Sequence, residues 1–141
     1  DGNSNMNIFK EIAKLNFPPD QYIIVGSGIM AVKGIREAND LDIIVTPELF
    51  EKCKIEGWEI HPWTKEGIPG KEWLKKGIID LYVQLSLKGG GVSAKELLRD
   101  AEFINSVPFI TLENHMKYKA EFGRPQDLAD IQMIKDYLSK K

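Results

Sequence analysis

Three aspartates in two apolar segments of this 141-residue chain could together hold a metal ion. Asp40 and Asp42 begin the run Asp-Leu-Asp-Ile-Ile-Val, and Asp80 lies inside Ile-Ile-Asp-Leu-Tyr-Val. Both runs are typical of buried strands, where a carboxylate is strongly destabilising unless another group compensates its charge. Carboxylate oxygens are ligands that divalent cations such as Mg²⁺ prefer. The pattern therefore predicts a metal site at Asp40, Asp42 and Asp80.

The spacing of these aspartates indicates which chemistry the metal would serve. Side chains at positions i and i+2 share one face of a strand, so Asp40 and Asp42 are expected to project together. Asp80 joins them if its strand pairs nearby. Two Mg²⁺ ions held about 4 Å apart can clamp an in-line phosphoryl or nucleotidyl displacement. The constellation is one for nucleotide transfer.

A glycine turn, Gly26-Ser27-Gly28, follows a β-rich segment and can be interpreted in two ways. Residues 26–31 fit the loose dinucleotide pattern G-x-G-x-x-A, but that fold places its ribose-binding acid near the end of the second strand. Here the acids stand at the start of that strand. In the second interpretation, Gly26 lets the backbone approach a triphosphate, and Ser27 and the first amides of the next helix donate hydrogen bonds to it.

Together these pieces resemble a known family, the small nucleotidyltransferases of the polymerase-beta-like fold. The family includes minimal antitoxin-type members and the lincosamide and aminoglycoside nucleotidyltransferases. The resemblance spans residues 21–135 and departs from the family at Gln126, where a lysine is frequent, and in lacking an appended acceptor-binding domain. Its matched segments are Val25-Gly26-Ser27, Gly34-Ile35-Arg36, Asp40-Leu41-Asp42-Ile43, Asp80, and Lys119-Ala120-Glu121-Phe122-Gly123-Arg124-Pro125-Gln126-Asp127-Leu128-Ala129-Asp130-Ile131.

The resemblance implies an enzyme that moves a nucleoside monophosphate from a nucleoside triphosphate, expected to be ATP, to a hydroxyl group. The acceptor would be a small molecule, an RNA end or a protein side chain. Asp80 would complete one metal site and act as, or beside, the base for that hydroxyl. The implied metal ligands for two Mg²⁺ ions are Asp40, Asp42 and Asp80, and the implied nucleotide-binding residues are Gly26, Ser27, Arg36 and Lys119.

Several of these residues also have a purely structural explanation. Ser27 could cap its helix, and Arg36 and Lys119 could form structural ion pairs. Asp127 and Asp130 suit the positive end of the last helix and are expected to be structural, as anchors for Arg124.

Other polar and aromatic residues give weaker signals. His61 and His115 lack the spacing of metal ligands, so no zinc site is expected. Lys75 and Lys76 are expected at a solvated edge. Four aromatic side chains are expected in the core rather than stacked on a base, namely Trp58, Trp63, Trp73 and Tyr82.

The pattern of apolar, capping and breaking residues predicts an α+β fold, a short mixed sheet flanked by helices. The predicted helices are 8–15, 29–35, 47–54, 94–102, 111–122 and 125–138. The predicted strands are 21–25, 41–46, 78–84 and a short edge strand at 109–110, with weaker strands or turns between 55 and 76 and a flexible loop at 89–91. Thr46 and Ser93 are expected as helix N-caps.

Length, charge and composition limit the number of domains, the binding partners and the location that the sequence allows. Residues 6–141 are expected to form a single domain, and residues 1–5 to be an appended, non-native stretch before a natural-looking start at Met6. A net charge of −2 argues against bulk nucleic-acid binding or a polybasic membrane patch. The single cysteine and the absence of an apolar leader or spanning segment favour the cytoplasm.

The expected partners are thus a nucleotide and a hydroxyl acceptor, with a protein as a further candidate and no membrane. The alternative function is a partner-binding module, such as the antitoxin of a toxin–antitoxin pair, with weak or no catalysis.

Overall fold

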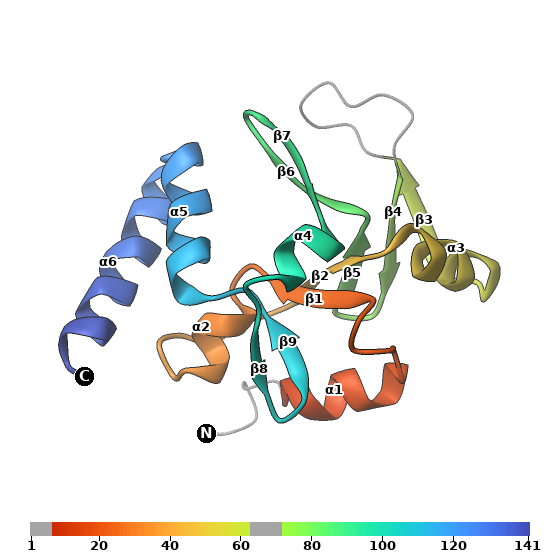
Figure 1. The fold of residues 1–141 in the computed structure, drawn as a ribbon, viewed down its shortest axis with the longest axis horizontal. Helices are drawn as coiled ribbons and strands as arrows, with labels where there is room; N and C mark the ends of the chain where they lie inside the picture. Colours follow the sequence, from red (N-terminus) through yellow and green to blue (C-terminus); the bar gives the residue numbers. More distant parts are fainter. Residues whose placement is uncertain (1–6, 63–71) are drawn as a thin grey trace.

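The computed structural model describes residues 7–62 and 72–141 and shows an α+β arrangement (Figure 1). The predicted appended stretch 1–5 and Trp63 lie outside the described residues. The helices are α1 Ile8–Leu15, α2 Gly28–Val32, α3 Pro47–Ile55, α4 Ala94–Leu98, α5 Leu112–Phe122 and α6 Pro125–Ser139. The strands are β1 Tyr22–Val25, β2 Leu41–Val45, β3 Glu59–Pro62, β4 Glu72–Lys76, β5 Ile79–Tyr82, β6 Gln84–Leu87, β7 Gly90–Ser93, β8 Glu102–Ile104 and β9 Val107–Phe109.

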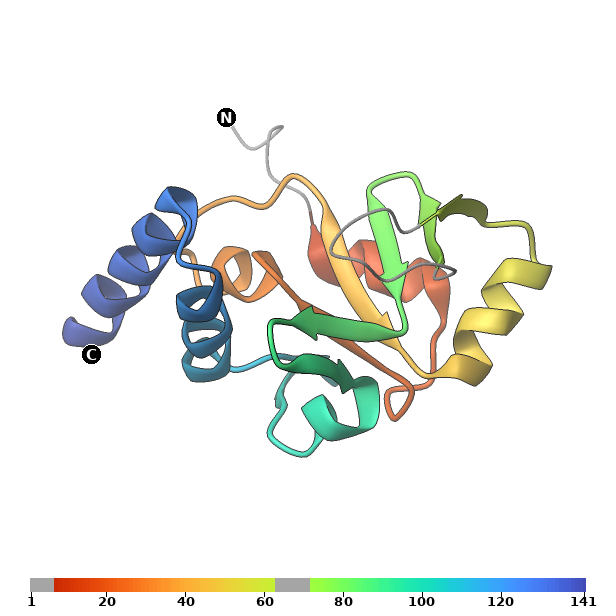
Figure 2. The ribbon, with the colours of Figure 1, turned by 90° about the horizontal axis from the view of Figure 1, so that it is seen from above.

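Seven of the described strands form a mixed sheet in the order β3-β4-β5-β2-β1-β9-β8. The β2–β5 and β1–β9 pairs are parallel, and the other pairs are antiparallel. Strands β6 and β7 form a separate hairpin, which lies between the α5–α6 pair and β4–β5 in both Figure 1 and Figure 2. The expected mixed sheet flanked by helices is therefore present.

One face of the sheet carries a continuous apolar row. The strand register places five side chains next to one another across five strands, and all are fully buried: Leu74, Leu81, Ile43, Ile24 and Phe109. Helix α2 covers this face, and Gly28 allows its close approach, because a Cβ there would lie 2.7 Å from Cγ2 of Ile24. Burying such a row supplies the main hydrophobic stabilisation of the sheet.

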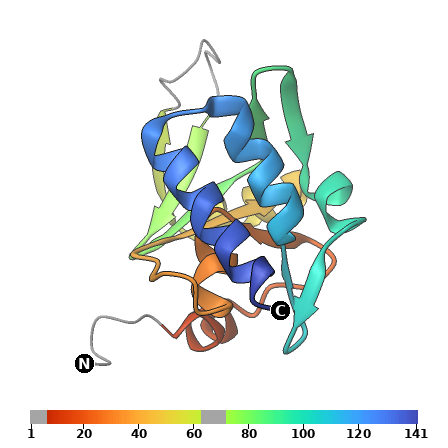
Figure 3. The same ribbon diagram turned by 90° about the vertical axis from the view of Figure 1, so that its left-hand side faces the viewer.

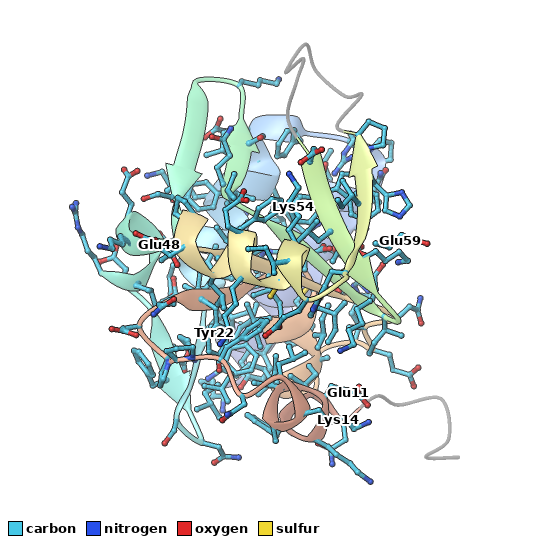
Figure 4. All side chains as sticks on the ribbon, turned by 90° about the vertical axis from the view of Figure 1, so that its right-hand side faces the viewer. Glu11, Lys14, Tyr22, Glu48, Lys54 and Glu59 are labelled. Carbon is cyan, nitrogen blue, oxygen red and sulfur yellow. The ribbon has the colours of Figure 1, made fainter. Side chains whose placement is uncertain are left out.

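Helix α3 begins where the sequence predicts. The Oγ1 atom of Thr46 accepts a hydrogen bond from the amide of Leu49 at 3.3 Å, and Pro47 occupies the first turn. Lys54 at the other end of α3 pairs with Glu72 of β4 at 2.6 Å. Figure 4 shows Lys54 on the strand side of α3 and Tyr22 between α3 and α1. Helix α3 is thereby attached to β4.

Helices α5 and α6 form an antiparallel pair (Figure 3) that lies at one end of the molecule in Figure 1. Gly123 ends α5 with a φ of 62°, in the left-handed region that glycine adopts without strain, and Pro125 begins α6. None of the helices in the described residues combines the length and apolar character needed to span a membrane.

The predicted strand 78–84 and the flexible loop 89–91 were both wrong in part. The chain leaves the main sheet after Tyr82, and Gln84 instead pairs with Ser93 in the β6–β7 hairpin. Gly90 and Gly91 belong to β7 rather than to a loop. Gly91 stands opposite Ser86, and a Cβ at Gly91 would meet the end of the Gln84 side chain, so the glycine leaves room for that side chain as it is placed here.

Two further boundaries differ from expectation. The capping box of Ser93 and Glu96 is present, but α4 ends at Leu98 and Glu102 already begins β8. The predicted edge strand at 109–110 is internal, because β9 lies between β1 and β8. Local patterns indicate where a strand forms, whereas its neighbours in the sheet depend on distant residues.

Candidate functional site

Asp42 and Asp80 lie next to each other on one face of the sheet. The parallel register of β2 and β5 pairs these two residues, and neighbouring strands are about 4.8 Å apart. Alternation along β2 and β5 puts both carboxylates on the face opposite the apolar row. Asp80 is buried and Asp42 half-buried, while Asp40, one residue before β2, is exposed. The strand pairing on which the predicted metal site depends is therefore present.

The negative charges of all three carboxylates affect the phenol group of Tyr82. Its phenol lies two residues beyond Asp80 on the same strand face. Burial raises the pKa of Tyr82, and the negative charges of Asp42, Asp80 and Asp40 raise it further. The phenol therefore remains protonated and neutral beside the acids.

The glycine turn comes directly over Asp42. Gly26 has a φ of 69°, and a Cβ added there would lie 3.0 Å from Oδ2 of Asp42. The register of β1 and β2 also pairs Val25 with Asp42. Ser27 occupies the N-cap position of α2, but its side chain makes no capping hydrogen bond. The structure thus brings the turn and the acids together, as the second interpretation of the turn requires.

A lysine that the sequence interpretation assigned to a solvated edge contacts this acidic group. Lys75 of β4 stands opposite Asp80 in the antiparallel register of β4 and β5. Its Nζ atom lies 3.0 Å from Oδ1 of Asp80. The hydrogen bond to Asp80 raises the pKa of Lys75, and the charges of Asp80, Asp40 and Glu59 add to the shift. Alternation along β4 puts Lys75 on one face of its strand, but the sequence could predict a contact with Asp80 only if β5 were known to be the neighbour of β4.

Among residues 7–62 and 72–141, no group of three or more His, Cys, Asp or Glu side chains is close enough to hold a metal ion as the side chains stand. The oxygen atoms of Asp40, Asp42 and Asp80 fit Mg²⁺ by chemical type. Their role as metal ligands stays a prediction.

Arg36 and Lys119 lie in an ion-pair network with the last helix. Arg36 donates from Nε and Nη2 to the two carboxylate oxygens of Asp130, at 3.0 and 3.1 Å. Lys119 lies 3.1 Å from Oδ1 of Asp127 and 2.9 Å from Oδ2 of Asp130. Arg124 donates to both oxygens of Asp127. These contacts agree with a structural role for both acids, but only Asp127 anchors Arg124, whereas Asp130 pairs with Arg36 and Lys119.

The ion pairs of this network favour the ionised forms of its two carboxylates. Hydrogen bonds from Arg124, with help from Lys119, hold the pKa of Asp127 well below its usual range although the side chain is fully buried. Burial opposes the ionisation of Asp130, but hydrogen bonds from Arg36 and Lys119 outweigh it and lower its pKa. Three cations share two carboxylates here, so these five side chains carry one surplus positive charge.

His115 of α5 lies next to this network and is neutral. It is 5% exposed, and its Nε2 atom is buried without a hydrogen-bond partner among the described residues. Burial and the nearby positive charge of Lys119 lower the pKa of His115 to about 4. A role in metal binding is not expected for it.

The aromatic residues divide into two groups. Trp58 is buried and stacks on Phe17 at a centroid distance of 6.3 Å, so its predicted core position is confirmed. Trp73 and Tyr82 instead form a half-buried ladder with His61, on the same sheet face as Asp80.

Comparison with known proteins found no similar protein. No family model, curated protein or solved structure matches the chain.

The contact between Gly26 and Asp42 can be measured in a double-mutant cycle. Gly26→Ala and Gly34→Ala both force alanine into a positive φ, which costs roughly 1–2 kcal/mol of stability. A Cβ at Gly34 meets nothing within 4 Å, so it is a matched control. We expect Asp42→Ala to reduce the loss of stability caused by Gly26→Ala, with a coupling energy of about 0.5–1 kcal/mol. The loss of stability caused by Gly34→Ala should stay unchanged. Urea denaturation checks this, and equal coupling at both glycines would contradict it.

The buried His115 should make the stability of the folded protein depend on pH. Its folded pKa is about 4 and its unfolded pKa about 6.5, so the unfolded state binds more protons between these values. Stability should therefore fall as the pH drops below about 6.5, by about 2 kcal/mol between pH 7 and pH 5. Urea denaturation of His115→Phe at pH 7 and pH 5 should show a smaller loss of stability than wild type shows over the same range. An unchanged slope in His115→Phe would refute the assignment.

Proposed function

We propose that this domain has a polymerase-beta-like nucleotidyltransferase fold and is a Mg²⁺-dependent nucleotidyltransferase. The observation that carries the proposal is the pairing of Asp42 with Asp80 on one sheet face, directly below the turn at Gly26. Three carboxylates near one place on a sheet are unfavourable unless cations compensate them. A polar turn beside such acids suits a substrate that brings both phosphate oxygens and metal ions.

The proposed assignment of roles follows the geometry. Asp40 and Asp42 would hold both Mg²⁺ ions, and Asp80 would complete one of the two sites. Bound Mg²⁺ would neutralise charge on the phosphates and on the departing pyrophosphate. The backbone at Gly26 and the hydroxyl of Ser27 would contact the triphosphate, expected to be that of ATP.

The proposed step is an in-line displacement. The acceptor hydroxyl oxygen forms a bond to the α-phosphorus, and the bond from that phosphorus to pyrophosphate breaks. Asp80, or a group beside it, accepts the hydroxyl proton. Most of the rate gain would come from positioning and charge neutralisation, because the transferred group needs little covalent help from the protein.

Arg36 and Lys119 would act on phosphate oxygens through their network. Both are paired with Asp130, so they are not lone cations. The surplus positive charge of the network favours an anion in its surroundings. We propose that they attract the triphosphate while also fixing α5 and α6.

The second function expected from the sequence, a partner-binding module, would need an exposed apolar patch. Helix α6 exposes Leu128, Met133 and Leu138. Successive members of this set are five residues apart, which turns the helix by about 140° each time, so they do not form one stripe. The described residues give this alternative less support than the acidic site gives the enzyme.

The enzyme proposal is tested by nucleotide transfer. Wild-type protein, Asp42→Asn and Asp20→Asn would be incubated with α-labelled ATP, Mg²⁺ and a cell extract as the source of acceptor. Asp20 is an exposed residue at the opposite end of β1 and serves as the matched control. We expect Asp42→Asn to lose at least about 100-fold in label transfer, because it removes a metal-binding charge, and Asp20→Asn to behave as wild type. Equal transfer by wild type and Asp42→Asn would refute the proposal.

A further inference from the structure

Lys75 occupies a special position in the candidate site. In the strand register it lies between two acids, Asp80 on the neighbouring strand β5 and Glu59 on the neighbouring strand β3. Its Nζ atom is 3.0 Å from Oδ1 of Asp80, whose side chain is 11% exposed, while the side chain of Lys75 is 37% exposed. A cation thus already contacts the most buried of the three carboxylates.

The neighbouring lysine shows that this contact is specific to one face. Lys76 follows Lys75 on the same strand, so its side chain projects to the opposite face. Its Nζ atom lies 5.5 Å from the ring centroid of Trp58 rather than near the acids. Two adjacent lysines therefore have separate surroundings, and they form a matched pair for comparison.

The charge of Asp80 requires a partner. A carboxylate this deeply buried is strongly destabilising when uncompensated, and removing one member of a buried ion pair leaves that penalty in place. Lys75 meets the requirement in the structure. A metal ion that takes Asp80 as a ligand would need the same carboxylate, and an ammonium group beside it would repel the ion.

We propose that Lys75 competes with the metal ion for Asp80: it compensates this carboxylate when the site is metal-free and leaves it when the ion binds. This inference rests on the proposed function, since it takes Asp80 to be a metal ligand. The partial exposure of Lys75 gives its ammonium group a route into water on release. Glu59, its neighbour on β3, is a second carboxylate on the same face, with its Oε1 atom 2.6 Å from Nε2 of His61.

Competition has a measurable consequence for metal affinity. Part of the binding free energy of the ion is used to break a charge-assisted hydrogen bond, so wild-type affinity is weaker than the carboxylates alone would give. Lys75→Met removes the competitor while keeping a similar apolar stem. A merely structural ion pair predicts the reverse, because its loss would loosen the strands that hold Asp80.

The first experiment titrates Mn²⁺ into the 141-residue protein and follows free Mn²⁺ by electron paramagnetic resonance. We expect Lys75→Met to lower the Kd roughly tenfold, with Lys75→Arg and Lys76→Met close to wild type. Lys75→Met with wild-type or weaker affinity overturns this inference while leaving the proposed function standing. Absence of Mn²⁺ binding by every one of these proteins overturns both.

The second experiment uses wild-type protein alone, so it does not depend on the folding of a variant. Reductive methylation of each lysine is followed by mass spectrometry in EDTA and in saturating Mg²⁺. We expect methylation of Lys75 to become several-fold faster with Mg²⁺, as its ammonium group moves from Asp80 into solvent, and that of Lys76 to stay constant. An unchanged or slower rate at Lys75 overturns the proposal.

Discussion

The parallel pairing of β2 with β5 places two carboxylates side by side at a spacing where their charges repel. The rest of the candidate site can be understood as a response to that constraint. Lys75 compensates Asp80 from the next strand, and Tyr82 stays protonated beside the acids. Gly26 lets the chain turn directly over Asp42, where a side chain would press on the carboxylate. The repulsion between these acids is the reason for proposing that an external cation binds there.

A second electrostatic cluster connects this region to the two C-terminal helices. Arg36 lies in the segment that leads to Asp40, and its bidentate pair with Asp130 joins residues 94 positions apart in the chain. Lys119 joins α5 to α6 through both Asp127 and Asp130. Because these carboxylates are buried and fully paired, the network limits how far the helices can move relative to the segment before β2. One set of ion pairs therefore supports the fold and carries one surplus positive charge.

Much of the local structure followed from short patterns. Thr46 with Pro47, Ser93 with Glu96, and Gly123 with Pro125 each marked a helix end correctly, because a cap depends on residues a few positions apart. Predictions failed where a boundary depended on a distant strand. Gln84 left the predicted strand 78–84 because it pairs with Ser93 of β7, and β9 became internal because β8 covers its other edge.

The amino-acid sequence by itself determined the acids, the glycine turn and the alternation that sends Asp80 and Tyr82 to the same side of their strand, since these are properties of consecutive residues. Only the tertiary structure decided that Asp42 faces Asp80, that Lys75 rather than Lys76 meets the acids, and that Arg36 pairs with Asp130. The physical reason is that strand order and register are chosen by burial of the whole apolar row, a sum over residues from five strands that no local pattern contains.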